Sequence, residues 1–75
     1  MQHQQMVDIR GMCCSAPVIR LAKEFAQFRS GEVVLVISDK ISMLNDIPAW
    51  CNLTGNGLMK AEQIGELHHF WIEKR

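Results

Sequence analysis

The apolar positions of this chain follow two different periodicities, which divide it into strands and helices. Residues 6–9 form a short apolar segment that stops before Gly11, and residues 32–37 contain an almost unbroken β-branched run. Runs of this kind predict strands. Because the second run contains five consecutive apolar residues, it predicts a central strand with other strands on both sides.

Between these two strands the apolar residues repeat at helical spacing. They are Val18, Leu21, Ala22, Phe25 and Phe28. This spacing places them on one helix face, with most of the charged residues opposite. Pro17 fits only a first turn, where no N–H is required, so we expect the helix to start near Cys14 or Ser15. Ser30-Gly31 is typical of a helix end.

A second helix is predicted over residues 41–53, with an interruption near its middle. Proline in a helix interior removes a hydrogen bond and clashes with the preceding turn, so Pro48 argues against a continuous helix. We expect a restart with Asp46 as the N-cap and Pro48 in the new first turn. Gly55 is a natural C-cap.

Two final strands, residues 57–63 and 67–73, are predicted with a short turn at Gly65 between them. The order is βαβαββ, and its first three elements favour a right-handed crossover with parallel strands. The expected fold is an α/β (α+β) two-layer sandwich, in which two helices cover one face of a four-stranded mixed sheet. We expect residues 6–75 to form a single domain and residues 1–5 a disordered tail.

Composition narrows the class of protein. The chain has 75 residues, with eight basic and eight acidic side chains that cancel, so direct nucleic-acid binding is not expected. No apolar stretch reaches the roughly 18 residues of a membrane span, and residues 1–5 lack the apolar core of a signal peptide. Three cysteines, two of them adjacent, do not resemble a disulfide framework. We expect free thiols and a cytoplasmic protein.

Residues 8–20 contain the best candidate for a reactive side chain, a cysteine thiol. Cys14 follows a glycine-containing turn and comes immediately before the first helix. The unpaired N–H groups and positive dipole end of a first helical turn favour a thiolate over a thiol. Such a sulfur can attack another sulfur atom. The simpler alternative is that Cys14 is buried as a small apolar side chain.

This segment resembles the signature of the TusA/SirA-like sulfur carriers, an Asp-x-x-Gly-x-x-Cys-Pro-x-Pro stretch that opens the first helix. Asp8, Gly11, Cys14 and Pro17 stand at the matching positions. The resemblance covers about residues 6–73. Its further blocks are Ser30-Gly31-Glu32-Val33, Asp39, Asp46-Ile47-Pro48-Ala49-Trp50 and Thr54-Gly55.

Ser15 is the one departure from this signature, because it replaces the proline that normally follows the cysteine. Proline at a helix start fixes φ and makes the loop rigid. Serine is compatible with a helix start but loses that rigidity, so we expect weaker or differently tuned activity.

The resemblance implies a sulfur relay. A donor protein such as a cysteine desulfurase or a rhodanese would transfer a sulfane sulfur to Cys14, and the persulfide would pass it to an acceptor sulfurtransferase. Such relays serve tRNA thiolation, molybdenum-cofactor assembly or sulfur oxidation, and selenium handling is suggested for some members. A sulfurtransferase of this kind acts with partner enzymes and needs no cofactor.

The remaining cysteines and the flanking arginines have simpler interpretations beside the functional ones. Cys13 is predicted to be structural or incidental, with a resolving or auxiliary thiol as the alternative; a disulfide between adjacent cysteines would be strained. Cys51 is predicted to pack in the core. Arg10 and Arg20 either stabilise a thiolate, bind an acidic partner, or remain solvated charges.

Other polar and aromatic residues are predicted to be structural. Asp8 and Asp39 follow strands, where carboxylates cap turns or helix starts. His68 and His69 are adjacent on a strand and point to opposite faces, so no metal site is expected. Three aromatic residues are predicted to pack in the core and on the sheet rather than to stack with bases; they are Trp50, Phe70 and Trp71.

Two other classes of function are compatible with the sequence. One is a non-catalytic protein- or RNA-interaction domain of the same fold, to which Arg10, Arg20 and Lys23 would contribute a local basic patch. The other is a thiol redox protein that pairs Cys14 with another cysteine. Fast and selective alkylation of Cys14 at neutral pH would favour the carrier.

Overall fold

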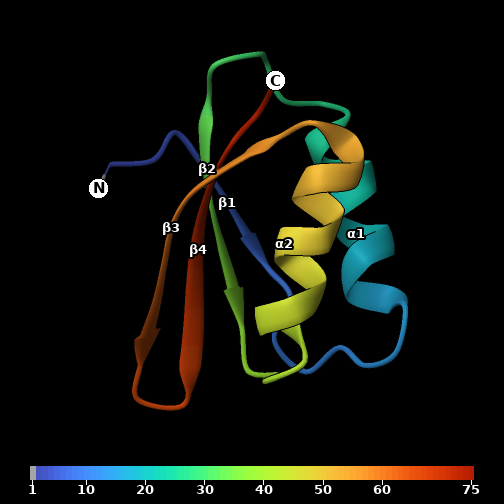
Figure 1. The fold of residues 1–75 in the computed structure, drawn as a ribbon, viewed down its shortest axis with the longest axis vertical. Helices are drawn as coiled ribbons and strands as arrows, with labels where there is room; N and C mark the ends of the chain where they lie inside the picture. Colours follow the sequence, from blue (N-terminus) through green and yellow to red (C-terminus); the bar gives the residue numbers. More distant parts are fainter. Residues whose placement is uncertain (1) are drawn as a thin grey trace.

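The computed structural model of the protein describes residues 2–75, and its elements follow the predicted βαβαββ order (Figure 1). The helices are α1, Ala16–Phe25, and α2, Met43–Thr54. The strands are β1, Gln5–Asp8; β2, Val33–Ser38; β3, Gly57–Ile64; and β4, Leu67–Glu73.

The strands form one sheet in the order β1-β2-β4-β3. β1 and β2 are parallel, because α1 connects them, whereas β2 and β4, and β4 and β3, are antiparallel. Both helices lie on one side of the sheet, which gives two layers (Figure 1). The predicted fold class is therefore confirmed.

The hydrophobic core lies between the helices and the sheet. β2 is an interior strand, and Val34 and Val36 on its helix-facing side are completely buried. From α1, Leu21 and Phe25 meet them at helical spacing, as the apolar pattern predicted. Residues from the other elements complete this core: Val7, Ile9, Met43, Ile47, Trp50, Cys51, Phe70 and Ile72.

The first helix is shorter than predicted. It begins at Ala16, with Pro17 in the first turn as expected, but it ends at Phe25. Beyond that point the N–H groups of Gln27 and Phe28 donate to carbonyls three residues back, which marks a tighter turn rather than an α-helix. Phe28 still packs against Phe25, with ring centroids 5.4 Å apart, so its apolar periodicity reflects burial outside the helix.

The second helix is continuous, so the predicted interruption is wrong. Ser42, not Asp46, is the N-cap, and Pro48 lies inside α2. An unbroken helix keeps Ile47, Trp50 and Cys51 together on the buried face. Gly55, with φ 79°, ends the helix as predicted.

The beginning of the chain pairs with β2 earlier than expected. Met1 lies outside the described residues, and β1 starts at Gln5 rather than Met6. The N–H of Gln4 donates to the Val33 carbonyl at 2.8 Å, and the Val33 N–H donates to the Gln4 side chain at 2.7 Å. Gln4 of the expected tail is therefore hydrogen-bonded to β2, and Gln5 is the first residue of β1, paired with Val34.

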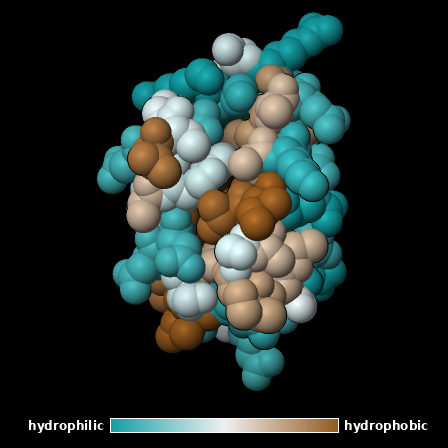
Figure 2. Space-filling model, turned by 90° about the vertical axis from the view of Figure 1, so that its right-hand side faces the viewer, coloured by the Kyte–Doolittle hydropathy of each residue, from teal (hydrophilic) through white to brown (hydrophobic). Residues whose placement is uncertain are grey.

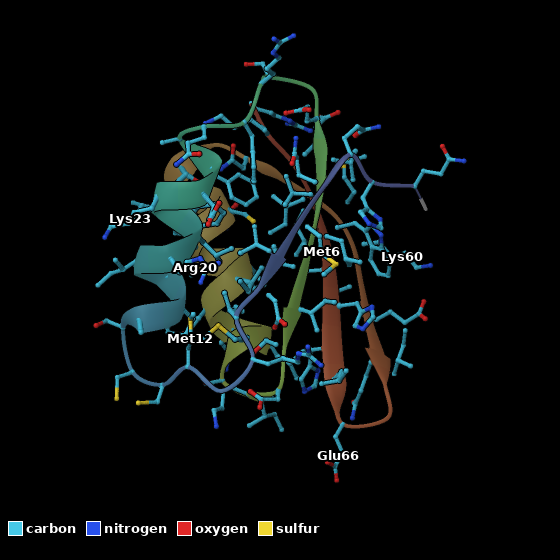
Figure 3. All side chains as sticks on the ribbon, turned by 180° about the vertical axis from the view of Figure 1, so that it is seen from behind. Met6, Met12, Arg20, Lys23, Lys60 and Glu66 are labelled. Atoms are coloured by element: carbon cyan, nitrogen blue, oxygen red, sulfur yellow. The ribbon has the colours of Figure 1, made fainter. Side chains whose placement is uncertain are left out.

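The sheet face opposite the helices carries a second, smaller apolar layer. Leu35 of β2 and Trp71 of β4 are register partners on this side, and both are buried. Lys60 of β3 lies over the Trp71 ring, 5.1 Å from its centroid, and points away from the helices (Figure 3). The structural interpretation of Trp50, Phe70 and Trp71 is confirmed, although Trp71 packs on the side without helices.

Candidate functional site: the cysteine loop before α1

The loop between β1 and α1 is anchored to the loop that follows β2. Because β1 and β2 are parallel, both strands end at the same edge of the sheet. There the N–H of Gly11 donates to both carboxylate oxygens of Asp39, at 3.1 and 3.2 Å. Gly11 has φ 76°, a conformation that glycine adopts without strain.

A second anchor holds the start of the same loop. The carboxylate of Asp8 accepts hydrogen bonds from the Arg10 backbone N–H at 3.0 Å and from the Arg10 guanidinium at 2.7 to 3.2 Å. These bonds lower the pKa of Asp8 from 3.8 to about 2. Between them Ile9 is completely buried and donates its N–H to Ile37 at 2.9 Å. The predicted turn-capping roles of Asp8 and Asp39 are confirmed.

Cys14 lies at the exposed part of this loop. Within residues 2–75 it is the one non-glycine residue with a positive φ, 64°. Its neighbour Met12 has its side chain partly buried against the core. The alternative that Cys14 is a buried apolar side chain is therefore wrong, and its sulfur is accessible to another protein.

The entrance to α1 is capped by backbone rather than side-chain groups. The Ala16 N–H donates to the Cys13 carbonyl at 3.2 Å, and the Ile19 N–H donates to the Ser15 carbonyl at 3.1 Å. The Ser15 hydroxyl makes no capping hydrogen bond, and Pro17 has no N–H. Among residues 2–75, Cys14 Sγ has one hydrogen-bond partner, Cys13 Sγ, and no helix amide contacts it at that range.

The sequence pattern of the family described as sulfurtransferase TusA matches residues 5–74. The chain belongs to this family. It is 28% identical over 74 residues to a putative sulfur carrier protein YrkI of Bacillus subtilis (strain 168), covering 99% of each chain. The expected resemblance to TusA-like carriers is confirmed.

Two sulfur carrier proteins named TusA are also similar. The protein of Allochromatium vinosum is 34% identical over 70 residues, 93% of this chain and 92% of the relative. The protein of Buchnera aphidicola subsp. Baizongia pistaciae is 29% identical over 69 residues, 92% of this chain and 87% of the relative. The relationship to TusA proteins therefore extends across almost the whole domain.

The TusA signature residues play different structural parts in this chain. Asp8 and Gly11 fix the base of the loop, and Cys14 is at its exposed part. Pro17 is completely buried at the second position of α1. Ser15, which replaces the usual proline, is the N-cap with φ −89°.

Both arginines near the cysteine loop form ion pairs with carboxylates. Arg10 forms an ion pair with Asp8, and Arg20 forms one with Glu24, a helical turn further along α1, at 3.1 Å. Over the described part of the chain, neither guanidinium is hydrogen-bonded to Cys14. Lys23 points away from the body of the protein (Figure 3). The predicted contact of Arg10 or Arg20 with a thiolate or partner stays a prediction.

The other two cysteines differ sharply in environment. Cys13 is exposed, and its Sγ lies 3.2 Å from Cys14 Sγ, with both thiols free. Cys51 is buried in α2, and burial raises its pKa to about 11. Its predicted core role is confirmed. The close approach of the adjacent thiols was not predicted from the sequence; it occurs together with a left-handed backbone at Cys14.

The two histidines of β4 occupy different environments. His68 is buried on the helix side, and His69 lies on the other face with its ring centroid 5.9 Å from that of Trp71. No group of three or more potential metal ligands occurs among residues 2–75. In the same range, no helix combines the length and apolar character needed to cross a membrane.

The helix side of the TusA domain also has a shallow cavity of about 230 Å³ between α1 and α2. Its lining residues are Val18, Asp46, Ala49, Trp50 and Leu53. Figure 2 shows this side, where hydrophobic patches are exposed among hydrophilic surface. This cavity was not predicted from the sequence, although one signal was present: Leu53 is an apolar residue on the exposed face of α2, where it is 86% exposed.

Proposed function

We propose that this TusA-family protein is a sulfur carrier, in which Cys14 accepts a sulfane sulfur as a persulfide and passes it to an acceptor protein. The observation that carries the proposal is the exposure of the Cys14 thiol on a loop with a fixed base. A carrier needs a sulfur that two different partners can approach, and a flexible attachment would make the approach less specific.

The transfer is an exchange between sulfur atoms. The Cys14 thiolate attacks the terminal sulfur of a donor persulfide, a new S–S bond forms, and the donor departs as its thiolate. A thiolate of the acceptor then attacks the terminal sulfur on Cys14 and releases the Cys14 thiolate. Neither step changes the total oxidation state, so the carrier requires no cofactor.

The sequence predicted that the first turn of α1 would favour a Cys14 thiolate; among the described residues no amide of that turn is hydrogen-bonded to Cys14 Sγ, so this part stays a prediction. Asp8 and Gly11 would act as positioning residues for the loop. Arg10 and Arg20 would leave their present ion pairs and bind acidic groups of a partner instead.

The partners belong to the same proposal. The donor would be a cysteine desulfurase or a rhodanese, and the acceptor a sulfurtransferase that serves tRNA thiolation, cofactor assembly or sulfur oxidation. Two relatives named sulfur carrier protein TusA, and one named putative sulfur carrier protein YrkI, support the carrier role. We also place the protein in the cytoplasm, because a carrier thiol must stay reduced between transfers.

Intact mass spectrometry tests the proposal directly. After incubation with a cysteine desulfurase and cysteine, the protein should gain the mass of one sulfur atom, which peptide mapping should assign to Cys14. Cys14→Ser should gain none, and the matched control Cys51→Ser should gain as much as the unchanged protein. Equal loading of Cys14→Ser would overturn the role of Cys14, and no loading of any variant by any desulfurase or rhodanese tried would overturn the carrier role.

A further inference from the structure

We propose that Cys13 is a resolving thiol for the Cys14 persulfide. It attacks Cys14 Sγ, expels the terminal sulfur as hydrosulfide and leaves a Cys13–Cys14 disulfide. The proposal rests on the proposed function, since it requires a persulfide on Cys14. It adds a second activity to the carrier: sulfur that no acceptor collects is released as sulfide.

The geometry of the two thiols carries the inference. Cys13 Sγ and Cys14 Sγ are 3.2 Å apart, and both residues are exposed. A nucleophile is therefore already in contact with the inner sulfur of the future persulfide. Closing this distance to the roughly 2.05 Å of a disulfide joins two residues that are adjacent in the chain, so the bond forms with strain.

Two local features of this chain accompany this geometry. Cys14 has φ 64°, and Ser15 follows it where the TusA signature has proline. Proline favours an extended conformation in the residue before it. Serine removes that preference and is compatible with the left-handed conformation of Cys14. The substitution of the proline and the adjacent thiol thus belong to one local arrangement.

The step balances without an external oxidant. The Cys13 Sγ–Cys14 Sγ bond forms, and the bond from Cys14 Sγ to the terminal sulfur breaks with its electron pair on the leaving sulfur. The sulfane sulfur is reduced to hydrosulfide, and the two cysteine sulfurs are oxidised to the disulfide. The proton of the Cys13 thiol passes to water or to the departing sulfide.

The product would not accumulate in a reducing environment. Adjacent Cα atoms are about 3.8 Å apart, which is shorter than the usual roughly 4.4–6.8 Å across a disulfide, so the bond is strained and easily reduced. A small thiol would reopen it by exchange and restore both cysteines. The pair therefore limits how long Cys14 keeps its sulfur, without inactivating the carrier permanently.

The full-length protein is loaded with a cysteine desulfurase and cysteine, separated from the donor and followed by intact mass without reductant. The unchanged protein should lose its sulfur adduct and become two hydrogens lighter than the reduced form, with one sulfide released per chain. Cys13→Ser should keep the adduct at least about tenfold longer, because an adjacent nucleophile reacts intramolecularly. Cys51→Ser is the matched control and should decay like the unchanged protein.

Ser15→Pro provides a second test that retains all three thiols. Once loaded, and at whatever rate it loads, it should lose the adduct more slowly than the unchanged protein, because the proline disfavours the left-handed conformation of Cys14. Decay as fast as in the unchanged protein would overturn the role given to Ser15. Equal adduct lifetimes with and without Cys13, or decay without the lighter species, would overturn the resolving role while the carrier role stands. Failure of every variant to load would instead overturn the carrier role and, with it, this inference.

Discussion

The backbone N–H of Gly11 donates to the carboxylate of Asp39, a residue 28 positions further along the chain, at 3.1 and 3.2 Å. This bond links the loop that carries Cys14 to the end of β2. It connects a candidate site on one segment to the rigid centre of the sheet. The loop is therefore positioned by the parallel pairing of β1 and β2, and not only by its own sequence.

Asp39→Ala should loosen the cysteine loop. Loss of this exposed hydrogen bond should lower the free energy of unfolding by about 1 kcal/mol, measured by urea denaturation. Loading of Cys14 by a desulfurase should slow, because the loop samples more conformations. Glu66→Gln, on the exposed β3–β4 turn, is the matched control and should change neither quantity. Unchanged loading of Asp39→Ala would show that the anchor does not serve sulfur transfer.

Asp8 should give the protein a small pH-dependent stability. Its pKa is about 2 in the folded state, below the ordinary value of 3.8, chiefly because its side chain is hydrogen-bonded to Arg10. The stabilisation is present above pH 3.8 and is lost as the pH falls towards 2. Because the pair is exposed, its contribution should be below about 1 kcal/mol.

Urea denaturation of the unchanged protein and Asp8→Asn between pH 7 and pH 2 checks this expectation. The difference between their free energies of unfolding should be constant above about pH 4 and should shrink below it. When Arg10→Gln is present in both proteins, the effect of Asp8→Asn on the free energy of unfolding should be smaller at neutral pH. A difference that persists at pH 2 would contradict the assigned cause of the pKa shift.

The backbone conformation of Cys14 predicts an unusual preference among substitutions. A left-handed φ disfavours residues with a Cβ, so Cys14→Gly should be more stable than Cys14→Ala by about 0.5–1 kcal/mol, after the entropy of the unfolded glycine chain is deducted. The matched pair at Cys13, which has no positive φ, should show the opposite order. Thermal or urea denaturation of the four variants decides this; the same order at both positions would contradict the left-handed conformation.

The sequence predicts the fold well because its proline and glycine residues mark the same element boundaries as its apolar pattern. Pro17, Gly55 and Gly65 mark a helix start, a helix end and a turn, and each is found at that place. The chemistry of the site is also readable: a cysteine between a turn and a helix is exposed, as the carrier hypothesis required.

The failures have a common physical cause, because tertiary packing decided what local signals could not. Phe28 repeats at helical spacing but reaches the core from a turn, where it contacts Phe25. Pro48 signals an interruption, yet burial of its neighbours keeps α2 whole.

Pro48 should cost the protein stability. Inside α2 it cannot donate to the carbonyl of Leu44, so Pro48→Ala should restore that bond and raise the free energy of unfolding by about 1–2 kcal/mol, part of the gain being offset by a freer unfolded chain. Pro17→Ala is the matched control. Pro17 lies in a first turn and is buried, so its replacement should destabilise. Equal effects of both substitutions in urea denaturation would contradict this assignment.

The three thiols should react in two distinct classes. Cys13 and Cys14 are exposed, whereas Cys51 is buried and has a pKa of about 11. At neutral pH, alkylation of the folded protein should therefore modify two cysteines readily, and Cys51 only after unfolding in urea. Mass spectrometry of digested peptides identifies each site. Cys51→Ser should leave the fast labelling of the other two unchanged, which controls for indirect effects. Rapid labelling of Cys51 in the folded protein would show that α2 opens under native conditions and would contradict the division into two classes.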